Sequence, residues 1–560
     1  MPRLTIATLS IRRTLTVLLF YIALTIALAF PLSLHPATRV FADNPDTHLF
    51  LWTLAWDTHA FTSRLDKFFD ANIYFPYDNT LAYSENLIGA AFFAAPVVWL
   101  TGNVVLAMNL VSLASCVLCG FGAYLLALRA RISHLGATLA GVVFLAAPPR
   151  FFRIGQLHLT TVHWLPFALA FYHAYLDGGR KRDLRLAVLF FTLQALTSGH
   201  GAVFLAVSML ALTLYRAALG ERIAIVARLR ELGLPGVLLL APSVFVMAPY
   251  RAAQNEVGLK RALYDWLPAP SSYLATPSHL HQYLRAFITD TNFNDSANAW
   301  LFPGVLTIVF AVVAVMPSAA AAPLPWRARL RHNAVAFYAL LALLAWLMFA
   351  PPPFGLWPHV HWMPGFNFIR VPSRFMILAM LALGVLVGAG FDRLAGRLGA
   401  VARRSAFAAA CAILIAEYAS MPLGSLPYAV DIPAIDRWLD TVPKSFAIAE
   451  VPVPSPGNLG AYERHHTTSM LHSMAHWQKT VHGYSGIRPP LHDRLYLELT
   501  AFPDEVSVAS LRRLGVTFVV VHTDMYPPGK WPQVEAKLAG FPGLRLEHVE
   551  GDGRVYTVLR

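Results

Sequence analysis

Cysteine and charge are both scarce in this chain. Only 3 of its 560 residues are cysteine, too few for a disulfide framework, and Cys116, Cys119 and Cys411 all lie in apolar stretches. Cys116 and Cys119 have the spacing of a redox pair, but they lack a thioredoxin-like context, so two small packing residues are the better interpretation. Charged residues make up 13% of the chain, against about 25% in soluble domains, which excludes an ordinary soluble protein.

Apolar residues are abundant and come in long runs. They make up 56% of the chain, and the mean hydropathy is +0.52. Runs of about 17 to 25 apolar residues, enough to cross a hydrocarbon core roughly 30 Å thick, recur through most of the sequence. The predicted fold class is therefore mainly α, a polytopic transmembrane helical bundle of about 11 spans. The predicted spans are residues 14–34, 104–128, 136–149, 162–176, 186–199, 201–217, 233–249, 299–316, 334–350, 373–391 and 405–422.

The net charge of +13 is explained by membrane topology without a nucleic-acid partner. Lys and Arg gather in short turns between spans, which is typical of cytoplasmic loops. These turns predict a cytoplasmic amino terminus, and eleven spans then place the C-terminal segment outside. That segment mixes acids with bases and has no basic face for nucleic acid. The basic turns are residues 129–134, 178–185, 216–230, 327–331 and 392–404.

The sequence predicts two domains, a transmembrane domain over residues 1–427 and an extracytoplasmic domain over residues 428–560. The second is polar and carries the signals of a small α/β fold. These signals are strand patterns at 446–451 and 517–522, a helix pattern at 504–514, and a hairpin turn at 550–553 that leads into a strand at 554–559.

The most polar part of the transmembrane domain is an outer loop, residues 35–103. Within it, Thr47 to Phe61 is amphipathic with two Trp, which predicts a helix lying at the membrane interface. The stretch from Asn86 to Leu100 is short for a span and is interrupted by Pro96, so we expect an interfacial or re-entrant helix on the outer side. A true span there would place the basic turn 129–134 outside, against the charge pattern.

Carboxylates at the two ends of this loop are the catalytic candidates. Asp43 and Asp46 follow the first span by some ten residues, where an ionised carboxylate can take a proton from an acceptor or hold a divalent cation, Mg²⁺ or Mn²⁺. The alternative is that Asp46 is only the N-cap of the next helix. Glu85 either lines the same cavity or caps a helix beginning at Asn86. The other acids of the loop are predicted to be solvated: Asp57, Asp66, Asp70 and Asp78.

Basic residues of the outer segments are the candidates for binding phosphate, because Arg offers a bidentate donor fork and His a further donor. They are Arg153, His158, His163, His200, Arg370 and Arg374. The spacing of five between His158 and His163 does not match a helical zinc site, and His200 lies between two glycines in a tight turn. All six have an alternative role as anchors among lipid head groups. The histidines of the C-terminal domain show no ligand spacing and are predicted to be surface residues: His465, His466, His472, His476 and His482.

The order of these features resembles the GT-C glycosyltransferase superfamily and its YfhO-like group. The resemblance is carried by Ile73-Tyr74-Phe75-Pro76, LAYSENLIG at 81–89, Met108-Asn109-Leu110, His163-Trp164-Leu165-Pro166 and Arg370-Val371-Pro372-Ser373-Arg374-Phe375. It implies a GT-C-like bundle in which an acid of the first outer loop is the base or metal ligand. Asp46 matches best by position, and Asp43 is next. Many members have a second acid in a later outer loop, and the candidates here, Asp290 and Asp295, match no motif.

The resemblance also implies a function. It predicts a membrane glycosyltransferase that moves a sugar from a polyprenyl-phosphate-linked donor to an envelope acceptor on the outer face of the bacterial inner membrane. Its partners would be the lipid-linked donor and membrane lipids, with the sugar and acceptor unspecified. The alternatives are a non-catalytic envelope-biogenesis protein and a lipid or saccharide transporter. Spans almost free of charged residues argue against ion-coupled transport.

Overall fold

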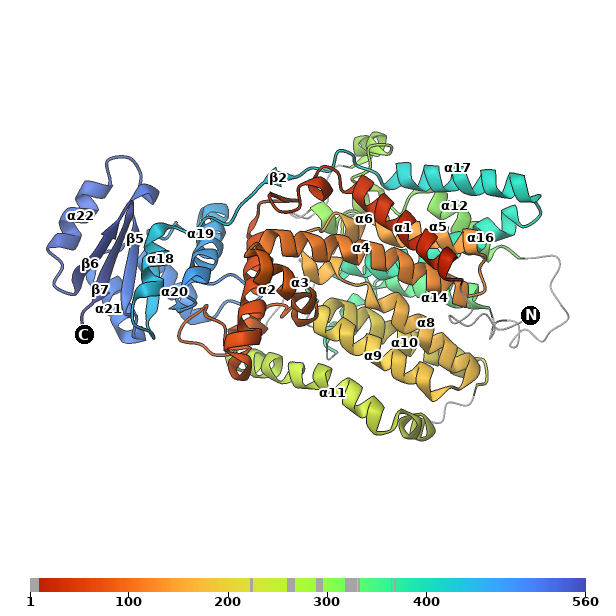
Figure 1. The fold of residues 1–560 in the computed structure, drawn as a ribbon, viewed down its shortest axis with the longest axis horizontal. Coiled ribbons are helices and arrows are strands. Elements are labelled where there is room, and N and C mark those ends of the chain that lie inside the picture. Colours follow the sequence, from red (N-terminus) through yellow and green to blue (C-terminus); the bar gives the residue numbers. More distant parts are fainter. Residues whose placement is uncertain are drawn as a thin grey trace. The chain divides into compact units, whose positions relative to one another are not determined.

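The computed structural model describes residues 10–221, 225–258, 267–288, 296–317, 330, 333–363, 365–366 and 369–560 (Figure 1). The chain divides into two compact units. Unit 1 consists of Met1–Pro36, Asn109–Phe245 and Arg261–Ser425, and unit 2 of Ala37–Met108, Val246–Lys260 and Leu426–Arg560. Unit 2 therefore combines most of the predicted outer loop with the predicted C-terminal domain. The domain boundaries drawn from the sequence stay a prediction.

Unit 1 is helical, and every predicted span overlaps one of its helices. These are α1 (Ile11–Leu28), α4 (Val104–Arg129), α5 (His134–Ala146), α6 (Pro148–Phe151), α7 (Leu157–Thr160), α8 (Trp164–Gly178), α9 (Lys181–Thr197), α10 (Gly199–Ala218), α11 (Ile225–Val257), α12 (Val305–Val315), α14 (Ala334–Leu347), α15 (Trp357–Val360), α16 (Met376–Ala395) and α17 (Ala400–Tyr418). The first residues of α4 and the last of α11 belong to unit 2.

Several of these helices are long and apolar enough to cross a membrane. Five meet this description among the described residues: α1, α4, α10, the part of α11 from Arg230 on, and a segment from Pro372 that contains α16. Four shorter helices are also apolar, α5, α12, α14 and, in unit 2, α3 (Ile88–Thr101). The count of eleven spans and their orientation stay predictions.

Helix α16 is the centre of unit 1, with 15 of its 20 residues buried. It packs against α5, α12 and α14. The contact with α5 is close because small residues face each other. A Cβ on Gly388 would lie 2.6 Å from the carbonyl oxygen of Gly136, and one on Gly384 would lie 2.9 Å from that of Ala140. Small residues spaced four apart let two helix backbones approach in this way inside a membrane.

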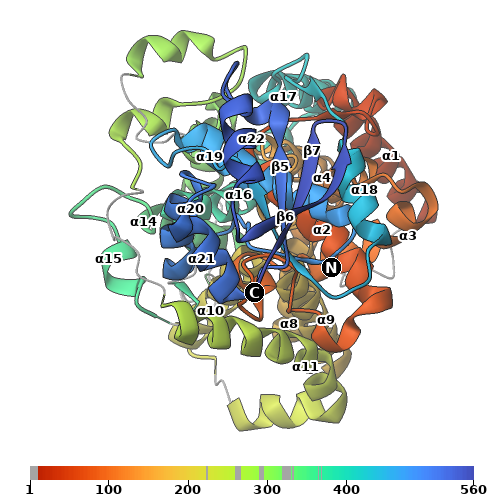
Figure 2. The ribbon, with the colours of Figure 1, turned by 90° about the vertical axis from the view of Figure 1, so that its left-hand side faces the viewer.

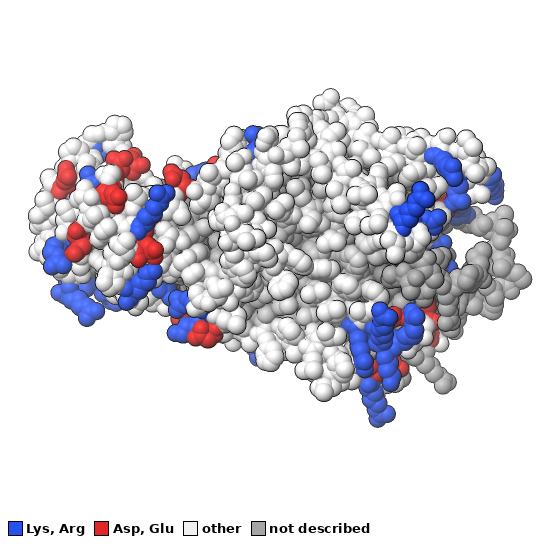
Figure 3. Space-filling view, viewed as in Figure 1, with Lys and Arg blue, Asp and Glu red and all other residues white. Residues whose placement is uncertain are grey.

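The surface of unit 1 fits a membrane protein. Figure 3 shows a broad area without charged side chains over its helices, and Lys and Arg gathered at the end where α16 leads into α17. Arg393, Arg403 and Arg404 belong to these two helices, in the basic turn that the sequence assigns to the cytoplasm. Helix α16 has 20 residues and is about 30 Å long, so its other end lies one membrane thickness away.

Unit 2 contains a five-stranded mixed sheet in the order β4-β3-β5-β7-β6 (Figures 1 and 2). Strand β3 runs parallel to β4 and β5, while β7 is antiparallel to β5 and β6. The strands are β3 (Ala447–Val451), β4 (Lys479–Thr480), β5 (Phe518–His522), β6 (Leu544–Glu550) and β7 (Gly553–Val558). These bounds confirm the predicted strands and the hairpin turn. Strands β3 and β5 are buried throughout, as apolar strands covered on both faces are.

Helices pack on the sheet and on the outer loop within unit 2. They are α2 (Pro45–Ser63), α3, α18 (Ala434–Thr441), α19 (Leu459–His472), α20 (Pro490–Leu499), α21 (Glu505–Leu514) and α22 (Trp531–Ala539). Ile435 and Leu439 of α18 pack against Ile448 and Val520 of the sheet. A short ladder, β1 (Arg39–Val40) with β2 (Leu426–Pro427), joins the outer loop to the C-terminal segment.

Three predictions about exposure are wrong. Helix α2 is not amphipathic at an interface, because residues 47–58 are all buried, with α3 and α19 packed against it. Asp57 is consequently 0% exposed rather than solvated. The histidines of the C-terminal domain are buried rather than on the surface, because β3, β5 and the helices around them enclose these side chains: His465, His466, His472, His476 and His482.

Candidate functional site

Five of the predicted phosphate-binding residues come together in unit 1. We call them the cationic cluster: Arg153, His158, His200, Arg370 and Arg374. They come from three segments far apart in the sequence, namely the turns between α5 and α8, the start of α10, and the stretch before α16. Only the tertiary fold brings these segments to one place.

The start of α10 positions two histidines of the cationic cluster. Ser198 is the N-cap of this helix, and its Oγ accepts a hydrogen bond from the amide of Gly201 at 3.0 Å. The same hydroxyl donates to the carbonyl oxygen of His158 at 2.5 Å. His200 therefore sits in the first turn of α10 beside His158, and their ring centroids are 5.1 Å apart. A helix amino terminus favours an anion, which adds to the positive character of this place.

The segment before α16 supplies two of the three arginines of the cationic cluster, Arg370 and Arg374. They are four residues apart, which would place them on one face of a helix. Pro372 begins a 3₁₀ turn, Pro372–Phe375, and α16 starts only at Met376. Arg370 and Arg374 are therefore not neighbours on one helix face. Arg370 is exposed and Arg374 is half-buried. Arg374 donates from Nη1 to Nε2 of His200 at 2.9 Å.

Positive charge dominates the electrostatics of the cationic cluster. Burial lowers the pKa of His158 well below its usual value, and the charges of His200, Arg374, Arg153 and Arg370 lower it further. The ring is consequently neutral at physiological pH, with Nδ1 and Nε2 still able to act as one donor and one acceptor. A phosphate oxyanion placed among these groups would be stabilised by several cations in a poorly solvated setting.

Neutral side chains hold Arg153 in place, and sequence reasoning missed them. Arg153 donates to the side-chain oxygens of Gln156 and Asn298. Ser373 donates to the backbone oxygen of Asn298 at 2.8 Å, which ties this network to the segment before α16. Nothing local in the sequence marks Gln156 or Asn298, and Ser373 is marked only as part of the motif at 370–375. Ser198 alone had a signal, since a serine before a helical pattern is a common N-cap.

His163 is placed apart from the contacts of the cationic cluster. Its Nδ1 lies 2.9 Å from Oγ of Ser115 on α4, and its ring packs on Trp164 at 4.5 Å. Arg150, which precedes it in the same segment, donates to the backbone oxygens of Phe144 and Leu145. Both residues therefore support the packing between α4, α5 and α8.

The carboxylates at the start of the outer loop lie in unit 2, with partners from α2, α19 and the segment between β4 and α20. Asp43 accepts from Nε2 of His48 at 2.8 Å and forms an ion pair with Nη1 of Arg464 at 3.1 Å. Burial lowers the pKa of His48 more than Asp43 raises it, so this ring donates as a neutral imidazole. Asp46 is half-buried and accepts from the hydroxyl of Tyr484 at 3.0 Å.

The N-cap role, which was the alternative for Asp46, belongs to Asn44. Asn44 is the N-cap of α2, and its side chain accepts from the amide of Thr47 at 2.9 Å. Asp46 lies in the first turn of the helix, where a negative charge is favourable. His48, Arg464 and Tyr484 are functional candidates that the sequence did not suggest, because two of them are more than 400 residues away along the chain.

Glu85 is buried in unit 2, close to the end of α11. It is 5% exposed, and the neighbouring Asn86 donates to the hydroxyl of Tyr250 at 2.9 Å. Helix α3 begins at Ile88, whose amide donates to the side chain of Asn86 at 3.0 Å. The two roles suggested for Glu85 stay predictions. Asp290 and Asp295 lie outside the described residues.

The residues around Asp46 do not form a ready Mg²⁺ or Mn²⁺ site. These ions take several oxygen ligands, and two carboxylates would be the minimum. The Asp43 carboxylate already pairs with Arg464, and no group of three or more metal-ligating side chains among the described residues includes Asp46. A divalent cation at Asp46 stays a proposal, and no step proposed below passes through it.

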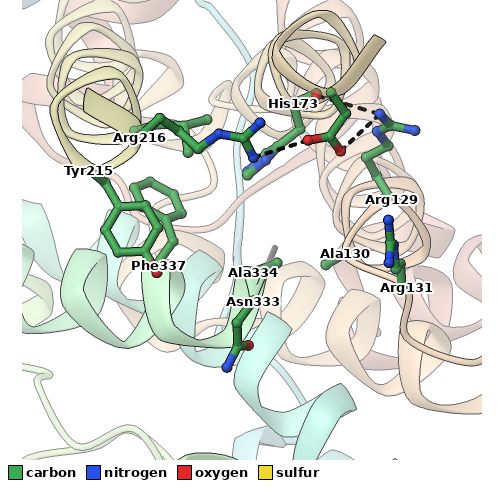
Figure 4. Close-up of a pocket in the computed structure, with 11 residues that line it drawn as sticks. Arg129, Ala130, Arg131, His173, Tyr215, Arg216, Asn333, Ala334 and Phe337 are labelled. Atoms are coloured by element: carbon green, nitrogen blue, oxygen red, sulfur yellow. Dashed lines mark hydrogen bonds and ion pairs between the residues drawn. The ribbon is translucent and has the colours of Figure 1, made fainter. Parts of the chain in front are cut away.

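A pocket at the far end of α10 from His200 is lined by an ion-pair cluster (Figure 4). Arg129 of α4 and Arg216 of α10 both point toward the Asp177 carboxylate, at 3.2 and 3.0 Å. Arg216 lies about 24 Å along α10 from His200, so this pocket and the cationic cluster are on opposite ends of the helix. The ion pairs join α4, α8 and α10, and the residues belong to segments predicted to be cytoplasmic.

Comparison with known proteins gives a likeness of fold. No family model matches the chain, and no curated protein matches it. ArnT from Cupriavidus metallidurans in the apo state is similar over 98% of this chain and 97% of that chain, with 14% identity and a TM-score of 0.47. The same protein bound to undecaprenyl phosphate covers 97% of both chains, with 13% identity and a TM-score of 0.46. The sequence identities and TM-scores are too low to infer the chemistry of this chain from ArnT.

Proposed function

We propose that this chain is a membrane glycosyltransferase that moves a sugar from a polyprenyl-phosphate-linked donor to an envelope acceptor, on the outer face of the inner membrane. The observation that carries the proposal is the convergence of the cationic cluster. Five basic groups from three distant segments meet at the end of α10 and α16 that lies opposite the basic turns. A lipid phosphate at the membrane surface needs such a cluster of fixed cations.

Each part of the cationic cluster has a task in this reaction. Arg153 and Arg374 bind the phosphate oxygens of the donor, and Arg370 adds positive charge from the exposed side. The acceptor hydroxyl attacks the anomeric carbon, the bond from that carbon to the phosphate oxygen breaks, and the polyprenyl phosphate leaves as an anion. The fixed cations stabilise the negative charge that grows on the leaving oxygen, without needing to reorient. Because the pKa of His158 is low, its neutral ring is a hydrogen-bond donor rather than an acid.

Asp46 is the proposed base. It would take the proton of the acceptor hydroxyl as the new bond to the sugar forms. Among the carboxylates of the first outer loop it is the better candidate, since Asp43 is held by both His48 and Arg464. The hydrogen bond from Tyr484 orients the Asp46 carboxylate. The resemblance of the sequence to GT-C enzymes supports the same choice.

Donor turnover in cells tests this function. Cells without the protein should accumulate a polyprenyl-phosphate-linked sugar, which mass spectrometry of lipid extracts identifies. The native chain should remove it, Asp46→Asn should not, and the matched control Asp66→Asn, a change at an exposed acid of the same loop, should behave as native. Normal turnover with Asp46→Asn would refute the assignment of the base.

Binding of undecaprenyl phosphate to the purified protein separates a transferase from the alternatives. Asp46→Asn should retain this binding while losing turnover, whereas Arg374→Gln should lose both. If the protein binds the lipid but no lipid-linked sugar accumulates without it, the chain is a lipid-handling or assembly protein, and the transferase proposal fails.

A further inference from the structure

A group of five buried, potentially metal-binding side chains lies in the C-terminal part of unit 2. We call it the histidine–carboxylate cluster: Asp436, Glu450, His472, His476 and His522. Their exposed fractions are between 0 and 6%. They come from α18, from β3, from the end of α19 and the turn after it, and from the last position of β5. Nothing in the proposed transfer reaction uses them.

The strand alternation places the group on one face of the sheet. Glu450 follows Ile448 by two residues on β3, and His522 follows Val520 by two residues on β5, so each shares the face of an apolar core residue. That face is the one covered by Ile435 and Leu439 of α18. Asp436 is next to Ile435 on the same helix, and its carboxylate lies near His472 and His476.

The ligand atoms are close enough to share one ion. Oε2 of Glu450 lies 2.8 Å from Nε2 of His522 and 3.2 Å from Nδ1 of His472. Oδ2 of Asp436 lies 3.8 Å from the same Nδ1. The ligand atoms of Glu450, His472 and His522 all lie within 4.8 Å of one another, and ligands of a tetrahedral Zn²⁺ are about 3.3 to 3.4 Å apart. Asp436 lies outside this group of three and would move closer to complete the ligand set.

Unsatisfied polar atoms give a second, independent reason for an ion. Within the part of the chain that the structure describes, neither oxygen of Asp436 has a hydrogen-bond partner, and the same holds for Oε1 of Glu450 and Nε2 of His476. Asp436 is 0% exposed. A buried carboxylate without hydrogen bonds is costly unless a cation compensates it.

The donor set selects the kind of metal. Imidazole nitrogens suit Zn²⁺ and other first-row transition metals, whereas Mg²⁺ and Ca²⁺ prefer oxygen ligands alone. Four protein ligands and complete burial are typical of a closed structural site. His476 lies with Nε2 at 3.7 Å from Oδ1 of Asp436, in position to orient that carboxylate.

A neighbouring histidine group is better explained by hydrogen bonds. His465, His466 and His482 also lie close together, but the amide of Glu450 donates to Nε2 of His482 at 2.7 Å. The proton of His482 is then on Nδ1, which is 3.0 Å from Nδ1 of His466 and donates to it. This chain of bonds holds the backbone at Glu450 and occupies both ring nitrogens of His482, one of the three ligands that a metal would need there.

We propose that Asp436, Glu450, His472 and His522 bind one divalent transition-metal ion, with Zn²⁺ the best match, in a structural site that joins α18 and α19 to β3 and β5. The ion would neutralise the two buried carboxylates. It would also hold these helices and strands together at a place where the side chains are polar and apolar packing is missing. The proposal does not depend on the glycosyltransferase function.

Metal analysis of the full-length protein tests the site. The protein is purified in detergent with a tag that contains no histidine, and bound metals are measured by mass spectrometry. We expect close to one equivalent of Zn²⁺ per native chain and its loss in His472→Gln and His522→Gln. The control His492→Gln should keep the metal, because His492 is equally buried but bonds the backbone oxygen of Phe75 at 3.1 Å.

Measurements on the native protein keep the proposal falsifiable if these variants fold poorly. A zinc chelator should lower its melting temperature, and added Zn²⁺ should restore it. X-ray absorption at the zinc edge should show only nitrogen and oxygen ligands. A native protein that contains no metal and whose melting temperature does not change with the chelator would overturn the proposal. The charge of the buried carboxylates would then be compensated by protonation of the cluster. Loss of metal in His466→Gln but not in His472→Gln would place the ion in the neighbouring group, and would also overturn it.

Discussion

Arg374 donates from Nη1 to Nε2 of His200 at 2.9 Å, which fixes the state of both side chains. Guanidinium has only donors and keeps its charge, so His200 must accept at Nε2 and carry its proton on Nδ1. The pair joins the segment before α16 to the first turn of α10. It therefore holds a permanent positive charge beside a helix amino terminus, where an anion would be bound.

Removing this charge should weaken lipid phosphate binding. We expect Arg374→Gln to raise the Kd for undecaprenyl phosphate about tenfold or more, since a hydrogen bond to a charged group contributes about 1.5 to 3 kcal/mol. The quenching of tryptophan fluorescence during a lipid titration measures this. Arg404→Gln removes the same charge from an exposed position on α17 and should leave the Kd unchanged. Equal effects of both changes would contradict a specific role for Arg374.

The buried carboxylate of Asp57 should destabilise the protein at neutral pH. Burial raises its pKa well above the usual value, and within the described residues neither oxygen has a hydrogen-bond partner. Asp57→Asn should therefore raise the melting temperature, with a gain of about 1 to 3 kcal/mol in unfolding free energy. Asp66→Asn, at an exposed acid, should change little.

The gain from Asp57→Asn should depend on pH with a definite sign. In the unfolded chain Asp57 loses its proton near pH 4, while the folded chain keeps it to higher pH. The native protein should therefore lose stability relative to the variant as pH rises above about 4, and the two should converge below that. Melting curves between pH 4 and 8 measure the difference, and a constant gap would show that charge is not the cause.

The contact between α5 and α16 should tolerate no side chain at Gly388. Its Cβ would lie 2.6 Å from a backbone oxygen of Gly136, which cannot rotate away. We expect Gly388→Ala to lower the unfolding free energy by about 1 to 3 kcal/mol through overpacking. Gly399→Ala is the control, since nothing lies within 4 Å of a Cβ there. Thermal unfolding in detergent should separate the two, and similar melting temperatures would argue against close packing of the helices.

The capping box at the amino terminus of α21 should stabilise this helix of unit 2. Asp504 accepts from the amide of Ser507 at 2.8 Å, and the Ser507 hydroxyl returns a bond to the Asp504 backbone. Asp504→Ala should cost about 1 kcal/mol, as loss of an N-cap does. Hydrogen exchange of the α21 amides should increase. Asp524→Ala changes an exposed acid outside this helix, and no increase in exchange is expected there.

The sequence by itself determined the elements of this protein. Long apolar runs predicted the helices of unit 1, and the short valine-rich run around Val520 predicted β5, because hydrophobic patterning is a local property. It also gave six candidates for binding phosphate, from their residue types and their place at the ends of spans: Arg153, His158, His163, His200, Arg370 and Arg374. Those inferences needed no knowledge of which segments meet.

Only the tertiary structure decided which side chains share an environment. The sequence ranks Asp46 before Asp43 by position alone, whereas the fold shows that Arg464, 421 residues away, engages Asp43. The histidines of the C-terminal domain have no ligand spacing, because their partners Asp436 and Glu450 come from different elements of the fold. The burial of α2 likewise depends on α19 packing over it. Burial and charge pairing act through space between distant segments, and local sequence patterns do not encode those distances.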